Sequence, residues 1–427
     1  MTAAPLLIVL PLLSAGLLLV MPRGWRAWVD LASCAVLLAI ALVLIGFPAA
    51  AFGPFSADGL GILTAVLLAA DGLAIRWYDR RDAAERAARH IGLAGMLLAC
   101  LGTDPALAWC GIVIATAAAV YPALEQIAGE RIVRTRESAL QSKELERFHF
   151  SGHTGNALGI VWDRVPLAGV ALFLALFGTI LPHASLGLPV QDVVTPDMAI
   201  AGIVAPGMVA PGVLAVGCLL SGYGAVAAIA PELAVPVLVI MIRLTSGDTG
   251  PPQQTLIVGF GLAAMTVCAL LPYIRPGLRR RPAWLFLGHA ALVLMLVGLG
   301  DADARFAAVA YLVLLVLTRA AMRLGQTRDA AGAASVLGLA AMQPVGVFPA
   351  VVLMLIAIAG SIPWLMVPVG VGLCAMGWAA LAGMPGIRRQ RLTLSPAWLA
   401  LLVILFIGWF LPAEAADWLR AIAGGTG

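Results

Sequence analysis

Long apolar stretches, separated by short polar segments, recur along the whole 427-residue chain. Residues 283–299 carry one titratable side chain, His289, and residues 362–384 carry no charge at all. A helix needs about 20 mostly apolar residues to cross the hydrocarbon core of a bilayer. With 62% hydrophobic and 11% charged residues, the composition exceeds what a soluble core absorbs. The sequence therefore predicts an all-α polytopic membrane protein.

Hydropathy predicts about fourteen spans. Their limits are 5–21, 28–50, 58–77, 88–102, 105–124, 157–181, 210–230, 232–247, 254–274, 283–299, 304–322, 333–358, 362–384 and 395–413. The eighth is short and contains Arg243. With this count, arginines gather in the loops on one side and aspartates on the other, so the positive-inside rule places both termini outside the cytoplasm.

We expect a single membrane domain over residues 1–427, with residues 125–156 as its longest cytoplasmic loop. The middle of this loop is either a surface helix that docks on a partner or a solvated linker. The six cysteines form no C-x-x-C or Cys/His pattern, so neither a disulfide framework nor a metal site is expected. No nucleotide loop, flavin fingerprint or nucleophile elbow occurs. We therefore expect no catalytic centre, no cofactor and no nucleic-acid partner.

The seventh span contains an interruption that points to transport proteins. Residues 219–231 read L-L-S-G-Y-G-A-V-A-A-I-A-P, with Gly222 and Gly224 in mid-span and Pro231 at the end. Such a break frees backbone groups that hydrocarbon cannot satisfy, so it is kept where it faces protein or a water-filled cavity. The run resembles the discontinuous helix of the antiporter-like membrane subunits of complex I, group 4 (hydrogenase-4-type) hydrogenases and Mrp antiporters. The resemblance extends over a core of about residues 52–384.

The same resemblance shows that two functional positions of the family have changed. The central lysine of the broken helix falls on Val226. Residues 103–116 read T-D-P-A-L-A-W-C-G-I-V-I-A-T, and alignment on Trp109 places the family's buried glutamate on Val113. Because the two charges normally support each other, losing both leaves an apolar contact and no unpaired charge.

Two titratable matches occur in the second half. Residues 278–300 read L-R-R-R-P-A-W-L-F-L-G-H-A-A-L-V-L-M-L-V-G-L-G, in which His289 matches the family's histidine. A histidine can relay a proton through its two ring nitrogens, although one in an apolar helix can also simply bond to a carbonyl. Residues 316–321 read V-L-T-R-A-A, with Arg319 on a family lysine. Arginine keeps its proton, so an ion pair or a lipid phosphate contact is favoured for Arg319.

Three other groups are candidates because charge is costly inside a bilayer. Asp71 lies deep in the third span, and either pairs with an arginine of a neighbouring helix or carries protons. His149 stands near a family lysine position, either in that role or as a headgroup-level histidine. Asp58 lies at the start of the third span and is expected to cap its helix.

Two functional interpretations follow. The first is a divergent antiporter-like subunit of a multi-subunit respiratory or energy-converting complex in the bacterial inner (cytoplasmic) membrane. In this interpretation the protein is structural, its partners are other membrane subunits and lipid, and its proton-pumping residues are degenerate. The alternative is a working proton or cation path through a non-standard set comprising Asp71, His149, His289 and Arg319.

Overall fold

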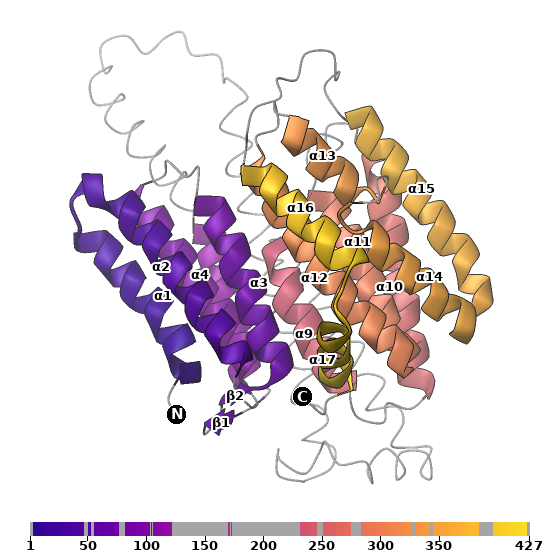
Figure 1. Cartoon of the computed structure of the whole chain (residues 1–427), viewed down its shortest axis with the longest axis horizontal. Coiled ribbons are helices and arrows are strands. Elements are labelled where there is room, and N and C mark those ends of the chain that lie inside the picture. Colours follow the sequence, from indigo (N-terminus) through magenta and orange to yellow (C-terminus); the bar gives the residue numbers. More distant parts are fainter. Residues whose placement is uncertain are drawn as a thin grey trace, which may run out of the picture.

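The structure is a computed structural model that describes residues 3–46, 50–52, 55–76, 82–102, 104, 106–121, 170, 172, 231–245, 251–274, 283–325, 330–341, 345–383 and 396–424. Its described part consists almost entirely of helices (Figure 1). His149, Val226 and the loop 125–156 lie outside these residues.

The N-terminal helices pack side by side on one flank of the molecule (Figure 1). They are α1 (Ala3–Val20), α2 (Arg23–Ile45), α3 (Gly59–Arg76) and α4 (Ala83–Leu101), followed by the helix Ala106–Tyr121. A small antiparallel hairpin of β1 (Ala50–Phe52) and β2 (Phe55–Ala57) precedes α3, in the register Ala50–Ala57 and Phe52–Phe55. Asp58 caps α3 as predicted, because its Oδ1 accepts a 2.8 Å bond from the Gly61 amide. The same oxygen accepts from Arg243 at 2.6 Å.

The second half begins with a 3₁₀ turn and continues through the centre to the opposite flank. Its helices are η2 (Pro231–Leu233), α9 (Ala234–Thr245), α10 (Pro251–Ile274), α11 (Ala283–Leu299), α12 (Ala302–Leu324), α13 (Ala330–Leu339), α14 (Phe348–Ser361), η4 (Pro363–Leu365), α15 (Met366–Gly383), α16 (Pro396–Trp409) and α17 (Ala413–Ala423). The limits of α11 match those predicted for the tenth span.

Helices α11 and α12 form the centre of the bundle. Most of their side chains are buried, and Leu292, Tyr311 and Leu315 are fully so. α12 packs against α3, which joins the N-terminal flank to the second half. α11 is apolar all round and must be covered on every side, which explains its place in the middle beside α12.

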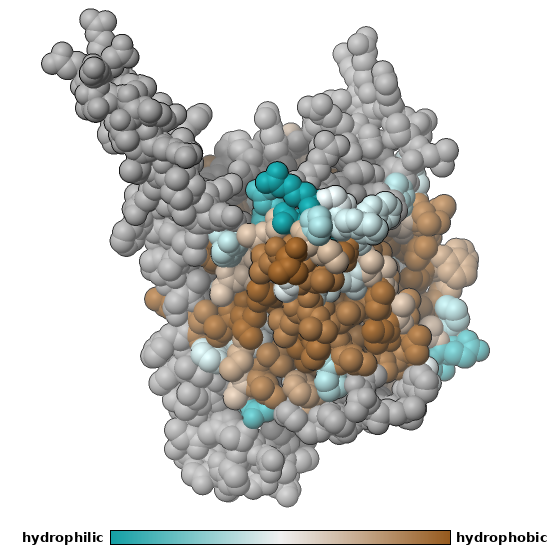
Figure 2. Space-filling view, turned by 90° about the vertical axis from the view of Figure 1, so that its left-hand side faces the viewer, coloured by the Kyte–Doolittle hydropathy of each residue, from teal (hydrophilic) through white to brown (hydrophobic). Residues whose placement is uncertain are grey.

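The remaining surface is suited to lipid. Five helices of the described residues are long and apolar enough to cross a membrane, and a sixth span arises if α16 and α17, bent by 79°, count as one. Four further apolar helices are shorter. Leu13, Val20 and Val43 are among the large apolar side chains exposed on α1 and α2. Figure 2 shows this flank as a broad hydrophobic area with hydrophilic residues along its upper edge. The number of about fourteen membrane-spanning helices stays a prediction.

The predicted span 333–358 is wrong as a single helix. α13 ends at Leu339 and α14 begins at Phe348, and Ala341 and Gly346 between them adopt positive φ values of 57° and 82°. A Cβ on Gly346 would lie 2.5 Å from the carbonyl oxygen of Gly338, so only glycine allows this close return of the chain. A second difference is α17, a short helix after the last predicted span.

Glycines bring α4 and the helix Ala106–Tyr121 into direct backbone contact. A Cβ on Gly111 would lie 2.5 Å from the Gly95 carbonyl oxygen and 2.5 Å from the Ala99 nitrogen. Close approach through small residues is a usual way for membrane helices to associate. Val113 lies on the second helix, two residues from this contact, and is half-buried.

Replacing Gly111 with alanine is therefore expected to lower the free energy of unfolding by about 1–3 kcal/mol, because the two helices must separate. The matched control is Gly16→Ala in α1, where a new Cβ meets nothing within 4 Å. Thermal unfolding followed by tryptophan fluorescence in detergent checks both variants. Equal midpoints for the two would contradict the tight contact.

Candidate functional site: a buried guanidinium–carboxylate network

A group of four charged side chains lies where α3, η2 and α12 meet. Arg319 Nη2 donates to Glu232 Oε2 at 2.9 Å. Arg323, one turn further along α12, lies 2.6 Å from Asp71 Oδ2 and 4.0 Å from Glu232 Oε2. Two guanidinium groups thus alternate with two carboxylates, and we call these four residues the α3–α12 network. It joins three segments that are far apart in the sequence.

Burial and stacking hold Arg319 in place within this network. Only 6% of its side chain is exposed, and its guanidinium lies 4.4 Å from the centre of the Phe286 ring of α11. A guanidinium at this position carries its charge permanently, so it can pair and stack but cannot pass on a proton. The pair with Glu232 is the ion pair that was one of the two roles expected for Arg319.

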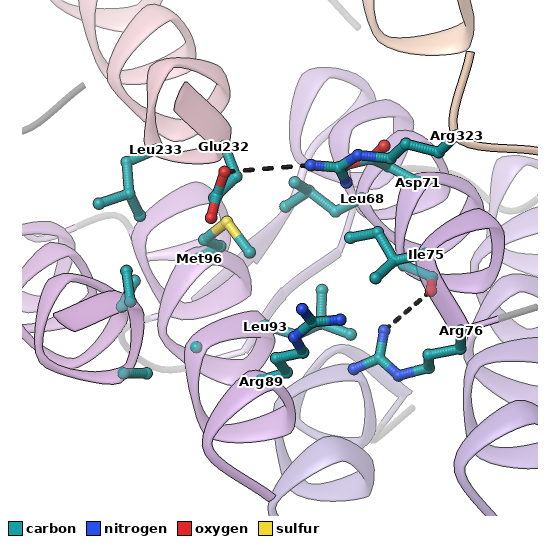
Figure 3. Close-up of a pocket in the computed structure, with 15 residues that line it drawn as sticks. Leu68, Asp71, Ile75, Arg76, Arg89, Leu93, Met96, Glu232, Leu233 and Arg323 are labelled. Atoms are coloured by element: carbon teal, nitrogen blue, oxygen red, sulfur yellow. Dashed lines mark hydrogen bonds and ion pairs between the residues drawn. The ribbon is translucent and has the colours of Figure 1, made fainter. Parts of the chain in front are cut away.

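A cavity of about 660 Å³ adjoins the network (Figure 3). Asp71, Glu232 and Arg323 line it on one side and Arg76 and Arg89 on another. The rest of its wall is mainly apolar, from Leu68, Leu93, Met96, Leu233 and the alanines of the helix Ala106–Tyr121. The network is therefore reachable by a small polar species.

A second charged cluster lies within the N-terminal flank and is centred on Asp30 of α2. Its Oδ1 lies 2.5 Å from Arg76 Nε and 2.9 Å from His90 Nε2, and its Oδ2 lies 3.1 Å from Arg86 Nη1. Only 1% of the Asp30 side chain is exposed. We call these four residues the Asp30 cluster. Arg76 belongs to this cluster and also lines the cavity.

His289 lies apart from both groups. It is fully buried in α11, and its Nδ1 shares a 2.7 Å hydrogen bond with the Tyr311 hydroxyl of α12. Its Nε2 has no hydrogen-bond partner among the described residues. The bond to Tyr311 forms a side-chain dyad between the two central helices, and the ring also interacts with the backbone of Leu339, as the expected carbonyl bond requires.

Of the predicted candidates, Asp71 and Arg319 come together through Glu232 and Arg323, whereas His289 is not bonded to them. Asp71 pairs with an arginine of a neighbouring helix, as one of its two interpretations required.

Sequence reasoning missed Glu232, Arg323 and Asp30. Each had a visible signal: Glu232 and Asp30 are carboxylates inside or beside apolar runs, where charge is costly. Arg323 follows Arg319 by four residues and so lies on the same helix face.

Comparisons with known proteins place the fold. No family model and no curated protein matches the sequence. Among solved structures, the chain matches a subunit of the membrane-bound sulfane sulfur reductase, an archaeal respiratory membrane complex, with a TM-score of 0.72 and 14% identity over 100% of this chain and 98% of the other. It matches a subunit of respiratory complex I from Thermus thermophilus with a TM-score of 0.70 and 15% identity over 99% and 98%.

A third match is a subunit of the Mrp complex from Dietzia sp. DQ12-45-1b, with a TM-score of 0.71 and 16% identity over 100% and 97%. Three complexes of different names thus contain a chain of similar length and fold. The protein is accordingly an integral membrane protein with the fold of the antiporter-like subunits of complex I, sulfane sulfur reductase and Mrp complexes.

Proposed function

We propose that the protein is a structural antiporter-like subunit of a multi-subunit energy-converting complex in the bacterial inner membrane. Its role is to occupy one subunit position and to hold neighbouring membrane subunits in place. The full-length match to subunits of three such complexes supports an assembled state. The orientation we propose, from the arginine distribution, has both termini outside the cytoplasm.

The observation that carries the structural role is the α3–α12 network. Its bases are arginines, and Lys143 is the only lysine of the chain. A buried lysine can lose and regain its proton because burial shifts its pKa readily, whereas an arginine cannot. With valine at positions 113 and 226, this subunit has exchanged a titrating pair for fixed ion pairs.

The test is purification of the tagged full-length chain from its native membrane in a mild detergent, followed by identification of co-purifying proteins. We expect stoichiometric recovery of other membrane subunits and of redox or antiporter subunits. Recovery of a clean monomer or homodimer would overturn the subunit proposal. It would favour a stand-alone transporter.

A second candidate function, a proton path with non-standard residues, is favoured by the His289–Tyr311 dyad. A buried imidazole that shares a hydrogen bond with a hydroxyl is a suitable relay group. Asp71 lines the cavity and could accept a proton from it. In the assembled complex, the dyad relays protons if this path operates, whereas it only connects two helices if the protein is structural.

His289→Gln in that complex is expected to leave the number of ions moved per electron unchanged, because the structural role needs no relay. Tyr311→Phe, which removes only the hydroxyl of the dyad, should behave in the same way. Ion uptake by vesicles containing the complex, measured together with electron transfer, provides the ratio. A clear fall for His289→Gln at normal assembly would establish the proton path instead.

A further inference from the structure

Two residues that line the cavity beside the network each hold a buried polar atom, opposite in character, without a partner among the described residues. These are Nη2 of Arg76 and Oδ1 of Asp71, on side chains that are 4% and 9% exposed. Both residues line the cavity, and both use their other polar atoms inside the protein. A buried polar atom without a partner costs free energy, so a ligand that turned either side chain toward the cavity would relieve that cost.

To satisfy both atoms, a ligand needs a hydrogen-bond acceptor at one end and a hydrogen-bond donor at the other. Arg76 Nη2 needs a hydrogen-bond acceptor, and Arg89 lies on the same side of the cavity (Figure 3). Asp71 Oδ1 needs a donor, and Glu232 lies beside it. Two guanidinium groups are a good match for a phosphate, and two carboxylates are a good match for an ammonium group.

We propose that this cavity binds a phosphoethanolamine group, with its phosphate toward Arg76 and Arg89 and its ammonium toward Asp71 and Glu232. A simple anion would leave Asp71 unsatisfied, and a simple cation would leave Arg76 unsatisfied. A zwitterion satisfies both ends, and its opposite charges match the mixed lining.

The apolar part of the wall indicates the source of the group. Leu68, Leu93 and Met96 offer the cavity a surface for methylene groups rather than for more charge. The volume of about 660 Å³ is within the usual range for small-molecule sites, about 300–1,000 Å³. Phosphatidylethanolamine therefore suits the cavity better than free phosphoethanolamine, although both share the recognised chemistry.

The test is native mass spectrometry of the full-length chain in detergent, titrated separately with phosphatidylethanolamine, phosphatidylglycerol and free phosphoethanolamine. The wild type should prefer phosphatidylethanolamine over phosphatidylglycerol. Arg89→Gln should weaken binding of both lipids about tenfold, the usual effect of losing one charge-assisted contact. Asp71→Asn should weaken only phosphatidylethanolamine, because phosphatidylglycerol carries no ammonium group.

Two further variants control for misfolding and for general loss of charge. Ala119→Phe keeps every charge and fills the cavity from the helix Ala106–Tyr121, so it should abolish binding of both lipids. Arg420→Gln, at an exposed side chain of α17 outside the cavity, should change nothing. Binding of free phosphoethanolamine alone, with the same dependence on Arg89 and Asp71, supports the site with a soluble source. Absence of binding, or equal binding by wild type, Arg89→Gln and Ala119→Phe, overturns the proposal.

Discussion

Asp30→Asn is expected to lower the free energy of unfolding by about 3–5 kcal/mol, the largest effect of any single substitution considered for this chain. The aspartate is the only carboxylate in the Asp30 cluster, and its two arginines have side chains that are 4% and 7% exposed. Without its charge, Arg76 and Arg86 remain buried close to each other with like charge. Asparagine keeps the size of the side chain, so the loss is electrostatic and leaves no cavity.

The matched control is Asp417→Asn, which breaks the pair between Asp417 and Arg420 on α17. Its side chains are 72% and 60% exposed, and exposed pairs contribute little, so a change below about 0.5 kcal/mol is expected. Denaturant-induced unfolding in detergent micelles measures both variants. Similar values for Asp30→Asn and Asp417→Asn would mean that the cluster does not hold α2, α3 and α4 together.

Helix limits were predictable from the sequence where a long, mainly apolar run ends abruptly. α3 and α11 begin and end within one residue of their predicted limits, because hydropathy changes sharply at Asp58 and at residue 300. α2 and α4 begin five residues earlier than predicted, at Arg23 and Ala83. Their first turns carry arginines, which lower hydropathy but are accommodated by ion pairs or by the membrane surface.

The broken span 333–358 shows the opposite case. A hydropathy average over this segment stays high, whereas its interruption depends on local backbone geometry at Ala341 and Gly346. The run M-Q-P-V-G at residues 342–346 carries both proline and glycine, which favour a turn. The turn signal was present, but it was outweighed by the apolar residues around it.

Only part of the candidate site was predictable from the sequence, because its ion pairs join residues that are far apart in the chain. That Asp71 needs a cationic partner follows from the cost of a charge in the bilayer. That the partner is Arg323, 252 positions later, depends on how α3 packs against α12. The sequence around Asp71 therefore predicts that a partner exists, but only the packing of the helices determines which residue it is.

Glu232→Gln is expected to lower the free energy of unfolding by about 2 kcal/mol, because it leaves the buried guanidinium of Arg319 without a carboxylate. The effect should be smaller than that of Asp30→Asn, since the Glu232 side chain is 37% exposed and solvent screens part of the loss. Arg323 keeps Asp71 as its partner.

The double variant Glu232→Gln/Arg319→Met tests whether the pair is structural. Methionine can pack on the Phe286 ring where the guanidinium lies, so removing both charges should recover most of the lost stability. A double-mutant cycle of unfolding free energies measures this coupling. If the two single effects simply add, Glu232 and Arg319 do not depend on each other, and the fixed ion pair proposed in place of a titrating lysine is wrong. If the double variant is as stable as the wild type and the complex still assembles, Glu232 and Arg319 need only each other, as expected for the fixed ion pair of the proposed structural subunit.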